Sequence, residues 1–127
     1  MKIKFVYGIL PAFVFVSDRL VKDGAAAQAR GPLIFMKPRL AMSLAFANGR
    51  AVLAHELVHV RQWYRTVFTH PFRYKLSQVY RANAEIEAYR AQSKVYPLDM
   101  TVVAANIKKD YDIKDISFTE ILRRLTA

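Results

Sequence analysis

Hydrophobic positions follow a strand-like pattern in the first third of the chain and a helical pattern after it. Residues 13–21 and residues 33–36 are runs of mainly apolar, aromatic or β-branched side chains, which favours two strands. Residues 25–30 are rich in Ala but lie between turn signals, and we expect them to form a returning strand. The pattern predicts a small, mostly antiparallel N-terminal sheet.

Turn-forming dipeptides separate these predicted strands. Asp23-Gly24 is typical of a two-residue hairpin, while Gly31-Pro32 and Lys37-Pro38 would end the strands on either side of the next turn. Residues 41–46 alternate between large and small side chains. They either form a further strand with a small-residue face or approach the next helix irregularly.

A helical period begins near residue 48. Asn48 is a residue type that caps helices, and no Pro interrupts residues 49–66. Apolar side chains recur at intervals of four, three and four, at Leu53, Leu57, Val60 and Tyr64. We predict a helix that packs this stripe against a core and presents its neighbouring face at a cleft.

Helical patterns continue to the end of the chain. Pro71 at a helix start and a stripe that reaches Arg90 predict one long helix from about residue 71 to about residue 93. Asp99 would cap a helix over residues 100–109, and residues 110–115 form a polar connector. Ser117-Phe118-Thr119-Glu120 matches a capping box and starts a last helix. The whole chain, residues 1–127, is predicted to be a single α+β domain.

Composition narrows the function classes. The chain has no Cys, which excludes disulfides, thiolate zinc sites and Cys nucleophiles. Twenty Lys and Arg against ten Asp and Glu give a net charge of +10, which attracts phosphates, anionic lipids or an acidic partner. Zinc-finger spacing, RNA-recognition aromatics and a Gly-rich phosphate loop are absent from the sequence. Nucleic-acid or anionic-membrane binding is therefore suggested by charge alone, through a patch of Arg61, Arg65, Arg73, Lys75, Arg81, Arg90 and Lys94.

The N-terminus resembles the start of a signal peptide. The apolar run over residues 5–16 follows two Lys, but it is too short to span a bilayer and Pro11 interrupts it. Ala27-Gln28-Ala29 resembles a cleavage site but lies far beyond the run. We expect a folded N-terminal segment, with a membrane anchor as the alternative.

The most informative stretch is His55-Glu56-Leu57-Val58-His59, which has the pattern H-E-x-x-H. On a helix, residues four apart lie on one face, so His55 and His59 can reach the same ion. Glu56 can then reach a water beside that ion and act as a general base. Two of the three His in the chain fall in this motif.

A catalytic zinc site typically takes three protein ligands, so a third is needed. Candidates downstream are His70, Glu85 and Glu87. The extended motif with a third His is excluded, because its Gly and His positions hold Gln62 and Arg65. His70 precedes a Pro near a helix start, where a capping or solvent-facing role is simpler.

A helical Glu in an E-x-x-A context after H-E-x-x-H resembles the gluzincin metallopeptidases. Within this group the chain is similar to the single-domain minigluzincins and to short bacterial and phage proteins of the same class, over about residues 33–92. The resemblance implies a zincin-like fold and Zn²⁺ held by His55, His59 and Glu85, with Glu56 as the catalytic base. Glu87 lies about 200° around the helix from Glu85 and is expected to be a solvated charge. Ala88 is small enough to let the two helices approach.

Other parts of the site stay open. Tyr89 stands where several gluzincins have an Asp that orients a ligand His, so Asn83 or a backbone carbonyl is the candidate for that role. Extended substrate would pair with an edge strand, formed by residues 33–36 or 41–46. The oxyanion donor would be one of four tyrosines, Tyr64, Tyr80, Tyr89 and Tyr96.

The predicted function is a zinc-dependent metalloendopeptidase that hydrolyses peptide or protein substrates. The resemblance further implies autoinhibition by the segment after Pro97. The alternative is a zinc-binding structural or interaction protein of a larger assembly, such as a phage virion component, that keeps a peptidase-like fold. Intact Glu56 favours the enzyme. We expect a soluble or assembly-bound protein, in the cytoplasm or a virion rather than secreted.

Overall fold

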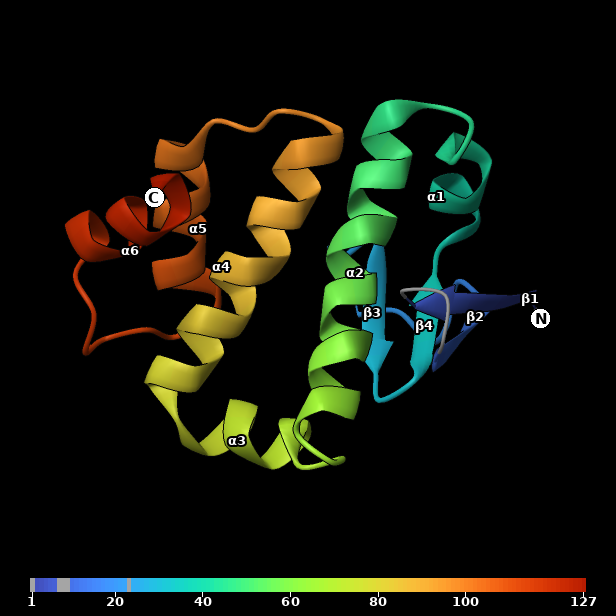
Figure 1. Ribbon diagram of the computed structural model, residues 1–127. Helices are drawn as coiled ribbons and strands as arrows, with labels where there is room; N and C mark the ends of the chain where they lie inside the picture. The colour runs from blue at the N-terminus through green and yellow to red at the C-terminus, as the bar shows by residue number, and fades with distance from the viewer. Residues whose placement is uncertain (1, 7–9, 23) are drawn as a thin grey trace.

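Four short strands form one sheet at the N-terminal side of the molecule (Figure 1). The computed structural model describes residues 2–6, 10–22 and 24–127. The strand order is β1 (Lys2–Val6), β2 (Leu10–Val16), β4 (Leu33–Met36) and β3 (Ala27–Arg30). β1 pairs antiparallel with β2 and β3 antiparallel with β4, whereas β2 and β4 run parallel. The α+β class is confirmed, and the sheet is mixed.

The predicted hairpin at Asp23-Gly24 is wrong. Asp23 itself lies outside the described residues, but β2 and β3, which the hairpin would join, are not neighbours. Three of the four residues of β4 are buried, so β4 takes a central place with a strand on each side. The tight turn instead lies between β3 and β4, where Gly31 has φ +59° and a Cβ would stand 3.2 Å from the Trp63 ring.

Two helices follow the sheet. Helix α1 (Pro38–Ser43) takes the place of the strand considered for residues 41–46, with Pro in its first turn. Helix α2 (Ala47–Arg65) carries the H-E-x-x-H motif and begins after Phe46. Asn48 is therefore not the N-cap, and its Oδ1 accepts a hydrogen bond from the Gly49 amide inside the first turn. The predicted stripe of α2 packs on the sheet core, which contains Ile34 and Met36.

The single long helix predicted from residue 71 to residue 93 is wrong. The chain forms α3 (His70–Leu76) and α4 (Gln78–Val95), separated by Ser77 in an extended conformation. The Ser77 hydroxyl accepts a hydrogen bond from the Tyr80 amide, so Ser77 caps α4. The break allows α3 to bridge the lower ends of α2 and α4 in Figure 1.

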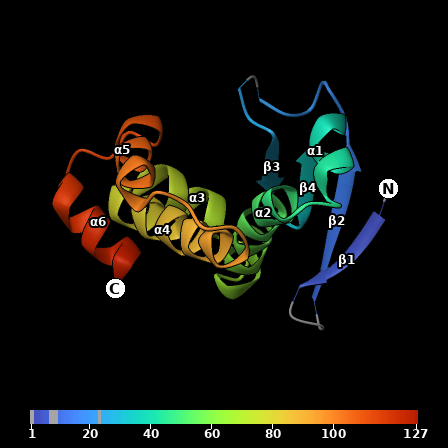
Figure 2. The same cartoon turned by 90° about the horizontal axis from the view of Figure 1, so that it is seen from above.

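Helices α5 (Met100–Asp110) and α6 (Phe118–Thr126) pack on the side of α4 that faces away from α2 (Figure 2). The predicted caps Asp99 and Ser117 both accept hydrogen bonds from backbone amides. A second core fills this side: Ala82, Ile86, Val103, Ala104, Ile107, Ile113, Ile116, Ile121 and Leu125. Helices α2 and α4 thus meet between two cores.

The apolar N-terminal run is divided between β1 and β2, while residues 7–9 lie outside the described residues. The described parts of this run belong to the sheet, as expected for a folded segment. A search of the described residues finds no helix with the length and apolar character needed to cross a bilayer.

Candidate metal centre

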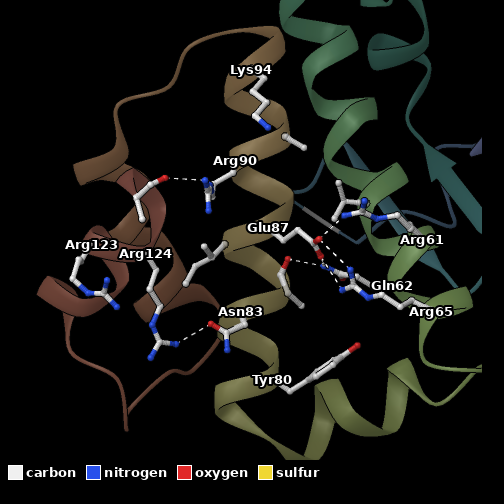
Figure 3. A pocket seen from close by; sticks show the side chains of 15 residues that line it. Arg61, Gln62, Arg65, Tyr80, Asn83, Glu87, Arg90, Lys94, Arg123 and Arg124 are labelled. Carbon is white, nitrogen blue, oxygen red and sulfur yellow. Dashed lines mark hydrogen bonds and ion pairs between the residues drawn. The ribbon is translucent and has the colours of Figure 1, made fainter. Parts of the chain in front are cut away.

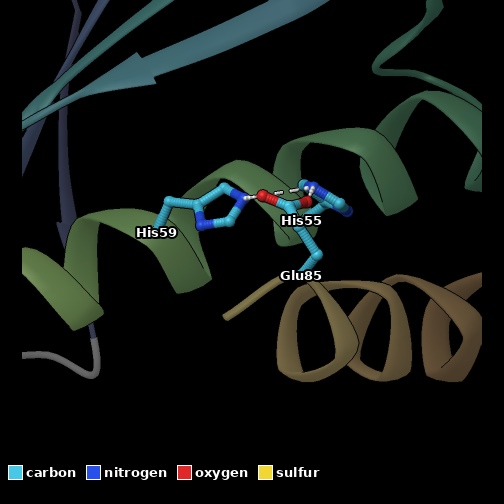
Figure 4. A group of neighbouring side chains, drawn as sticks. All are labelled: His55, His59 and Glu85. Atoms are coloured by element: carbon cyan, nitrogen blue, oxygen red, sulfur yellow. Dashed lines mark hydrogen bonds and ion pairs between the residues drawn. The ribbon is translucent and has the colours of Figure 1, made fainter. Parts of the chain in front are cut away.

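Three predicted ligands converge between α2 and α4 (Figure 4). His55 Nε2 lies 3.2 Å from Glu85 Oε1, and His59 Nε2 lies 3.1 Å from Glu85 Oε2. The two Nε2 atoms are 3.3 Å apart. One ligand atom from each residue lies within 4.8 Å of the others, which is compact enough for one ion. Residues 30 positions apart in the chain are thus brought into a single cluster.

Helix packing explains why these side chains meet. His55 and His59 are one turn apart on α2, and Glu85 projects from α4 opposite them. Ala84 and Ala88, on either side of Glu85, are buried at 5% and 0% exposure. Such small side chains let α2 and α4 approach closely, which is the role expected for Ala88. Glu85 itself is only 1% exposed.

The amide of Gln62 fixes the orientation of the His59 ring. Gln62 Nε2 donates to the Ala84 carbonyl and to Glu87 Oε1, at 3.0 and 2.8 Å. Its Oε1 therefore accepts, and it lies 2.9 Å from His59 Nδ1, which must carry the hydrogen. The Nε2 lone pair of neutral His59 then points at the Glu85 carboxylate.

Gln92 fixes the orientation of the His55 ring in the same way. Its Oε1 lies 2.9 Å from His55 Nδ1, which leaves His55 Nε2 directed at the cluster. The prediction that Asn83 orients a ligand His is wrong, because its side chain accepts a hydrogen bond from Arg124 on the α6 side. Neither Gln was predicted. Their spacing is a usable signal, since Gln62 lies one turn after His59 and Gln92 lies two turns after Glu85 on the same face.

The electrostatics of the cluster favour a cation. Two Nε2 lone pairs and the carboxylate are all acceptors, and Glu85 Oε1 is buried without a hydrogen-bond donor among the described residues. Burial raises the pKa of Glu85, but His59 and His55 outweigh it and hold the pKa well below its usual range. Burial lowers the pKa of His59, but Glu85 above all raises it, to about 9. A buried positive charge is needed here, either a proton or a metal ion.

The donor set suits a divalent transition metal. Neutral imidazole nitrogens and a carboxylate are ligands of zinc and of other first-row metals, and a two-His, one-carboxylate set leaves coordination positions open. The protein's described residues offer this one cluster of three such groups. The residues therefore fit a catalytic type of metal site.

A cleft of about 1140 Å³ opens over the cluster. His55, His59, Glu85 and Glu56 all line it, together with β3, α3 and the end of α5. Glu56 is 8% exposed and lies one position after His55 on α2. Glu56 is thus placed to exchange a proton with a molecule bound in the cleft.

His70 lies near the cluster but is not a fourth member of it. Its Nδ1 is 2.6 Å from the Tyr80 hydroxyl, and its ring centroid is 6.0 Å from that of His59. Burial and the neighbouring His59 lower the pKa of His70 to about 4. The capping or solvent-facing role expected for His70 is wrong, because Thr69 is the N-cap of α3 and the half-buried His70 lines the cleft.

Glu87 faces away from the cluster, as predicted from its helical angle. It was expected to be a solvated charge, and its side chain is partly exposed at 32%, but it also forms ion pairs with Arg61 and Arg65 and accepts from Gln62 (Figure 3). Glu87 therefore ties α4 to α2. The pairs lie in a groove of about 830 Å³ lined by Arg61, Arg65, Arg90, Lys94, Arg123 and Arg124, among other residues.

The remaining basic residues of the predicted patch lie elsewhere. Arg73 and Lys75 are exposed on α3. Arg81 donates to the carbonyls of Tyr74, Tyr111 and Asp112, which joins α3, α4 and the end of α5. The seven cations therefore do not form one continuous surface.

The tyrosines around the site differ from those expected. Tyr89 packs edge-on against His55, with ring centroids 4.4 Å apart. Tyr64 packs in the sheet core and Tyr96 is 48% exposed. The hydroxyl closest to the ligands belongs to Tyr74, which was not predicted and donates to Glu85 Oε2 at 2.6 Å. Burial, and then Glu85, raise the pKa of Tyr74, which keeps this hydroxyl protonated.

Two further expectations about the cleft need correction. β4 is an interior strand and residues 41–46 are not a strand, so neither provides an edge for substrate. The strand at the sheet edge that lines the cleft is β3. The segment after Pro97 packs on α4, and its only residues that line the cleft are Asp110, Tyr111 and Asp112 among those described. Autoinhibition by this segment stays a prediction.

Comparison of the chain with protein-family models gave no match, and comparisons with curated proteins and with solved structures gave none. These results neither support nor contradict the resemblance to the gluzincins. The functional argument depends on the geometry of the cluster and its cleft.

Proposed function

We propose that this protein is a zinc-dependent metalloendopeptidase. The observation that carries the proposal is that the Glu56 carboxylate lines the same cleft as His55, His59 and Glu85. A purely structural metal site has no use for a carboxylate placed in this way. Zinc fits the three donors and would act there as a Lewis acid that lowers the pKa of water.

Each residue then has a defined part. His55, His59 and Glu85 would hold the ion, and Gln62 and Gln92 would keep both Nε2 lone pairs directed at it. Glu56 would take a proton from the attacking water and return it to the leaving amine. The Tyr74 hydroxyl would fix the Glu85 carboxylate through its 2.6 Å hydrogen bond.

The substrate class follows from the edge strand. β3 pairs with β4 on one side only, so its other side offers backbone N–H and C=O groups. An extended peptide could add to this edge and pass over the cluster, which is the geometry of β-augmentation. All four residues of β3 line the cleft.

The test measures zinc content and peptide cleavage together. Wild-type protein should bind about one zinc ion per chain and cleave members of an unbiased peptide library. Glu56→Gln should keep the zinc and lose about 10²–10⁴-fold in cleavage rate. Glu87→Gln makes the same chemical change on α4, at a carboxylate that faces away from the cluster, and should keep both properties.

The outcomes separate the alternatives. Zinc bound without any cleavage by the wild type would favour the structural or interaction protein that keeps a peptidase-like fold. Protein that binds neither zinc nor another divalent metal would contradict both. Loss of zinc in Glu56→Gln would show that Glu56 is a ligand rather than a base.

A further inference from the structure

Helix α3 has its polar and apolar faces reversed. His70 and Tyr74, four residues apart, point inwards and line the cleft. Phe72 and Leu76, on the opposite side of the helix, are 70% and 82% exposed. A surface helix normally buries its apolar face, so this helix presents to solvent what is usually covered.

The exposed apolar surface extends beyond the helix. Val67 and Phe68 precede α3 and are 73% and 55% exposed, and Val79 on the first turn of α4 is 50% exposed. Five large apolar side chains within 13 residues are therefore accessible at the end of the molecule that α3 forms in Figure 1. Single exposed apolar residues are ordinary, but a group of this kind marks an interaction surface.

The backbone before α3 is held in an unfavourable conformation. Val67 and Phe68 have φ values of 50° and 70°, in the left-handed region that a β-branched residue rarely adopts. Their amides donate to the carbonyls of Tyr64 and Trp63, which fixes this conformation. Such strain costs about 1–3 kcal/mol and is typical of functional segments. Here it holds two apolar side chains in solvent.

Basic side chains border the apolar stripe of α3 on both sides. At 100° per residue, Arg73 lies about 60° beyond Leu76 and Lys75 about 60° before Phe72. Both are exposed, and α3 contains no acidic residue. A central apolar stripe between two cations is the pattern of a helix that lies in a membrane interface.

We propose that the α3 surface, formed by Val67, Phe68, Phe72, Arg73, Lys75, Leu76 and Val79, docks on an anionic lipid bilayer. Phe68, Phe72 and Leu76 enter the boundary between headgroups and acyl chains, while Arg73 and Lys75 contact lipid phosphates. The net charge of +10 draws the protein to such a surface. A symmetric contact between two copies would instead place like charges together.

Docking has a consequence for the cleft. Tyr74 on the inner face of α3 contacts Glu85, and the outer face of the same helix meets the bilayer. An α-helix is about 10 Å across, so the cleft would open close to the headgroups. The inference itself does not rest on the proposed peptidase function, because it uses no residue of the cluster.

The test is flotation of the whole protein with lipid vesicles. Wild-type protein should bind vesicles of phosphatidylcholine with about 30% phosphatidylglycerol, and bind at least tenfold more weakly without the anionic lipid. Phe72→Ser with Leu76→Ser should reduce binding to the anionic vesicles by about tenfold or more. Val102→Ser, at a residue 52% exposed on α5, is the matched control and should bind like the wild type.

A charge pair of variants tests the basic border. Arg73→Glu with Lys75→Glu should weaken binding by about tenfold or more, whereas Arg39→Glu with Lys109→Glu changes the net charge equally at exposed positions elsewhere and should weaken it less. Trp63, the only Trp, lies 4.4 Å from Phe68 between ring centroids. Lipids brominated on their acyl chains should therefore quench its fluorescence.

The results distinguish docking of the α3 surface on a bilayer from its contact with a second copy of the chain. Equal loss of binding in both charge pairs, or no effect of the Phe72 and Leu76 changes, would overturn the proposal. Absence of vesicle binding by a folded wild type would do the same. Concentration-dependent dimers that disappear in the Phe72 and Leu76 variant would assign the surface to a second copy. Circular dichroism and chemical denaturation serve to show that each variant is folded.

Discussion

His59 and Gln62 are joined by a hydrogen bond of 2.9 Å between Nδ1 and Oε1, one turn apart on α2. The same Gln62 amide donates to Ala84 and Glu87 on α4. One buried side chain therefore both orients a candidate metal ligand and fastens the helix that carries Glu85. Ligand geometry and helix packing are coupled through this residue.

Gln92 orients His55 as Gln62 orients His59, so replacing Gln92 should weaken metal binding. Gln92 is less buried than Gln62 and bonds His55 at 2.9 Å, so Gln92→Leu removes the orienting bond with little loss of packing. We expect the zinc affinity to fall about 10–100-fold, because the His55 ring is no longer held in one tautomer and orientation. Competition with a chromogenic chelator measures the zinc affinity.

Gln78→Leu is the matched control for this prediction. Gln78 lies two turns before Glu85 on α4 and accepts hydrogen bonds from the amides of Lys114 and Asp115, which are not part of the cluster. Its loss should lower the thermal stability without changing the zinc affinity. Unchanged affinity in Gln92→Leu would mean that the His55 ring is oriented by packing against Tyr89 instead.

Replacement by Gln should abolish zinc binding at Glu85 but leave it unchanged at Glu87. Glu87→Gln removes ion pairs with Arg61 and Arg65, and because these groups are partly exposed we expect the free energy of unfolding to fall by only about 1 kcal/mol. Zinc content should stay at the wild-type value. Glu85→Gln should abolish zinc binding, because a neutral amide cannot compensate a divalent ion between two imidazoles.

Chemical denaturation and metal analysis of both variants check this contrast. A Glu87→Gln protein that lost its zinc would show that the Gln62 amide depends on Glu87 for its orientation. A Glu85→Gln protein that kept its zinc would remove Glu85 from the ligand set.

The stability of the metal-free protein should depend on pH through the cluster. Burial lowers the pKa of His59, but Glu85 above all raises it, from 6.5 to about 9. The stability contributed by protonated His59 is therefore complete below pH 6.5 and lost as the pH rises towards 9. The pKa of Glu85 is lowered from 4.5, so its contribution is present above pH 4.5 and lost in acid. Chemical denaturation across this pH range measures both effects.

Zinc competes with the proton on His59. The increase in melting temperature on adding zinc should therefore grow between about pH 6 and pH 9, and binding at pH 7 should release about one proton. Calorimetry in buffers of different ionisation enthalpy counts that proton. A zinc effect that is constant over this range would contradict the assignment.

The parts of the structure that local patterns determine could be predicted from the sequence. The four-residue spacing of His55 and His59, the stripe of α2 and the caps Asp99 and Ser117 all depend on neighbours in the chain. Glu85 needed the family resemblance, because no local rule places α4 opposite α2. The strand order could not be read, since the pairing of β2 with β4 rather than with β3 depends on the burial of β4 between two strands.

The break between α3 and α4 was missed for a chemical reason. The apolar stripe over residues 72–79 has helical spacing, and no Gly or Pro interrupts it. Ser77 ends α3 and starts α4 through its side chain, which accepts from the Tyr80 amide at 3.1 Å. A Ser inside a periodic pattern gives no warning of this role, and the exposure of Phe72 and Leu76 shows that the stripe does not face a core.

Substitution of Ser77 tests this break and its effect on the site. Ser77→Ala removes the cap of α4 and should lower the free energy of unfolding by about 1 kcal/mol. Ser77→Asp keeps an acceptor at the cap and should restore most of that loss. Chemical denaturation of the three proteins measures the difference.

The same pair of variants links the cap to the metal centre. Ser77 sets the angle at which α3 presents Tyr74 to Glu85 Oε2. If the Ser77→Ala change allowed α3 and α4 to merge into one helix, Tyr74 would leave the carboxylate and the zinc affinity would fall while helix content rose in circular dichroism. Unchanged stability in Ser77→Ala would instead show that packing of His70 and Tyr74, and not the cap, fixes the break.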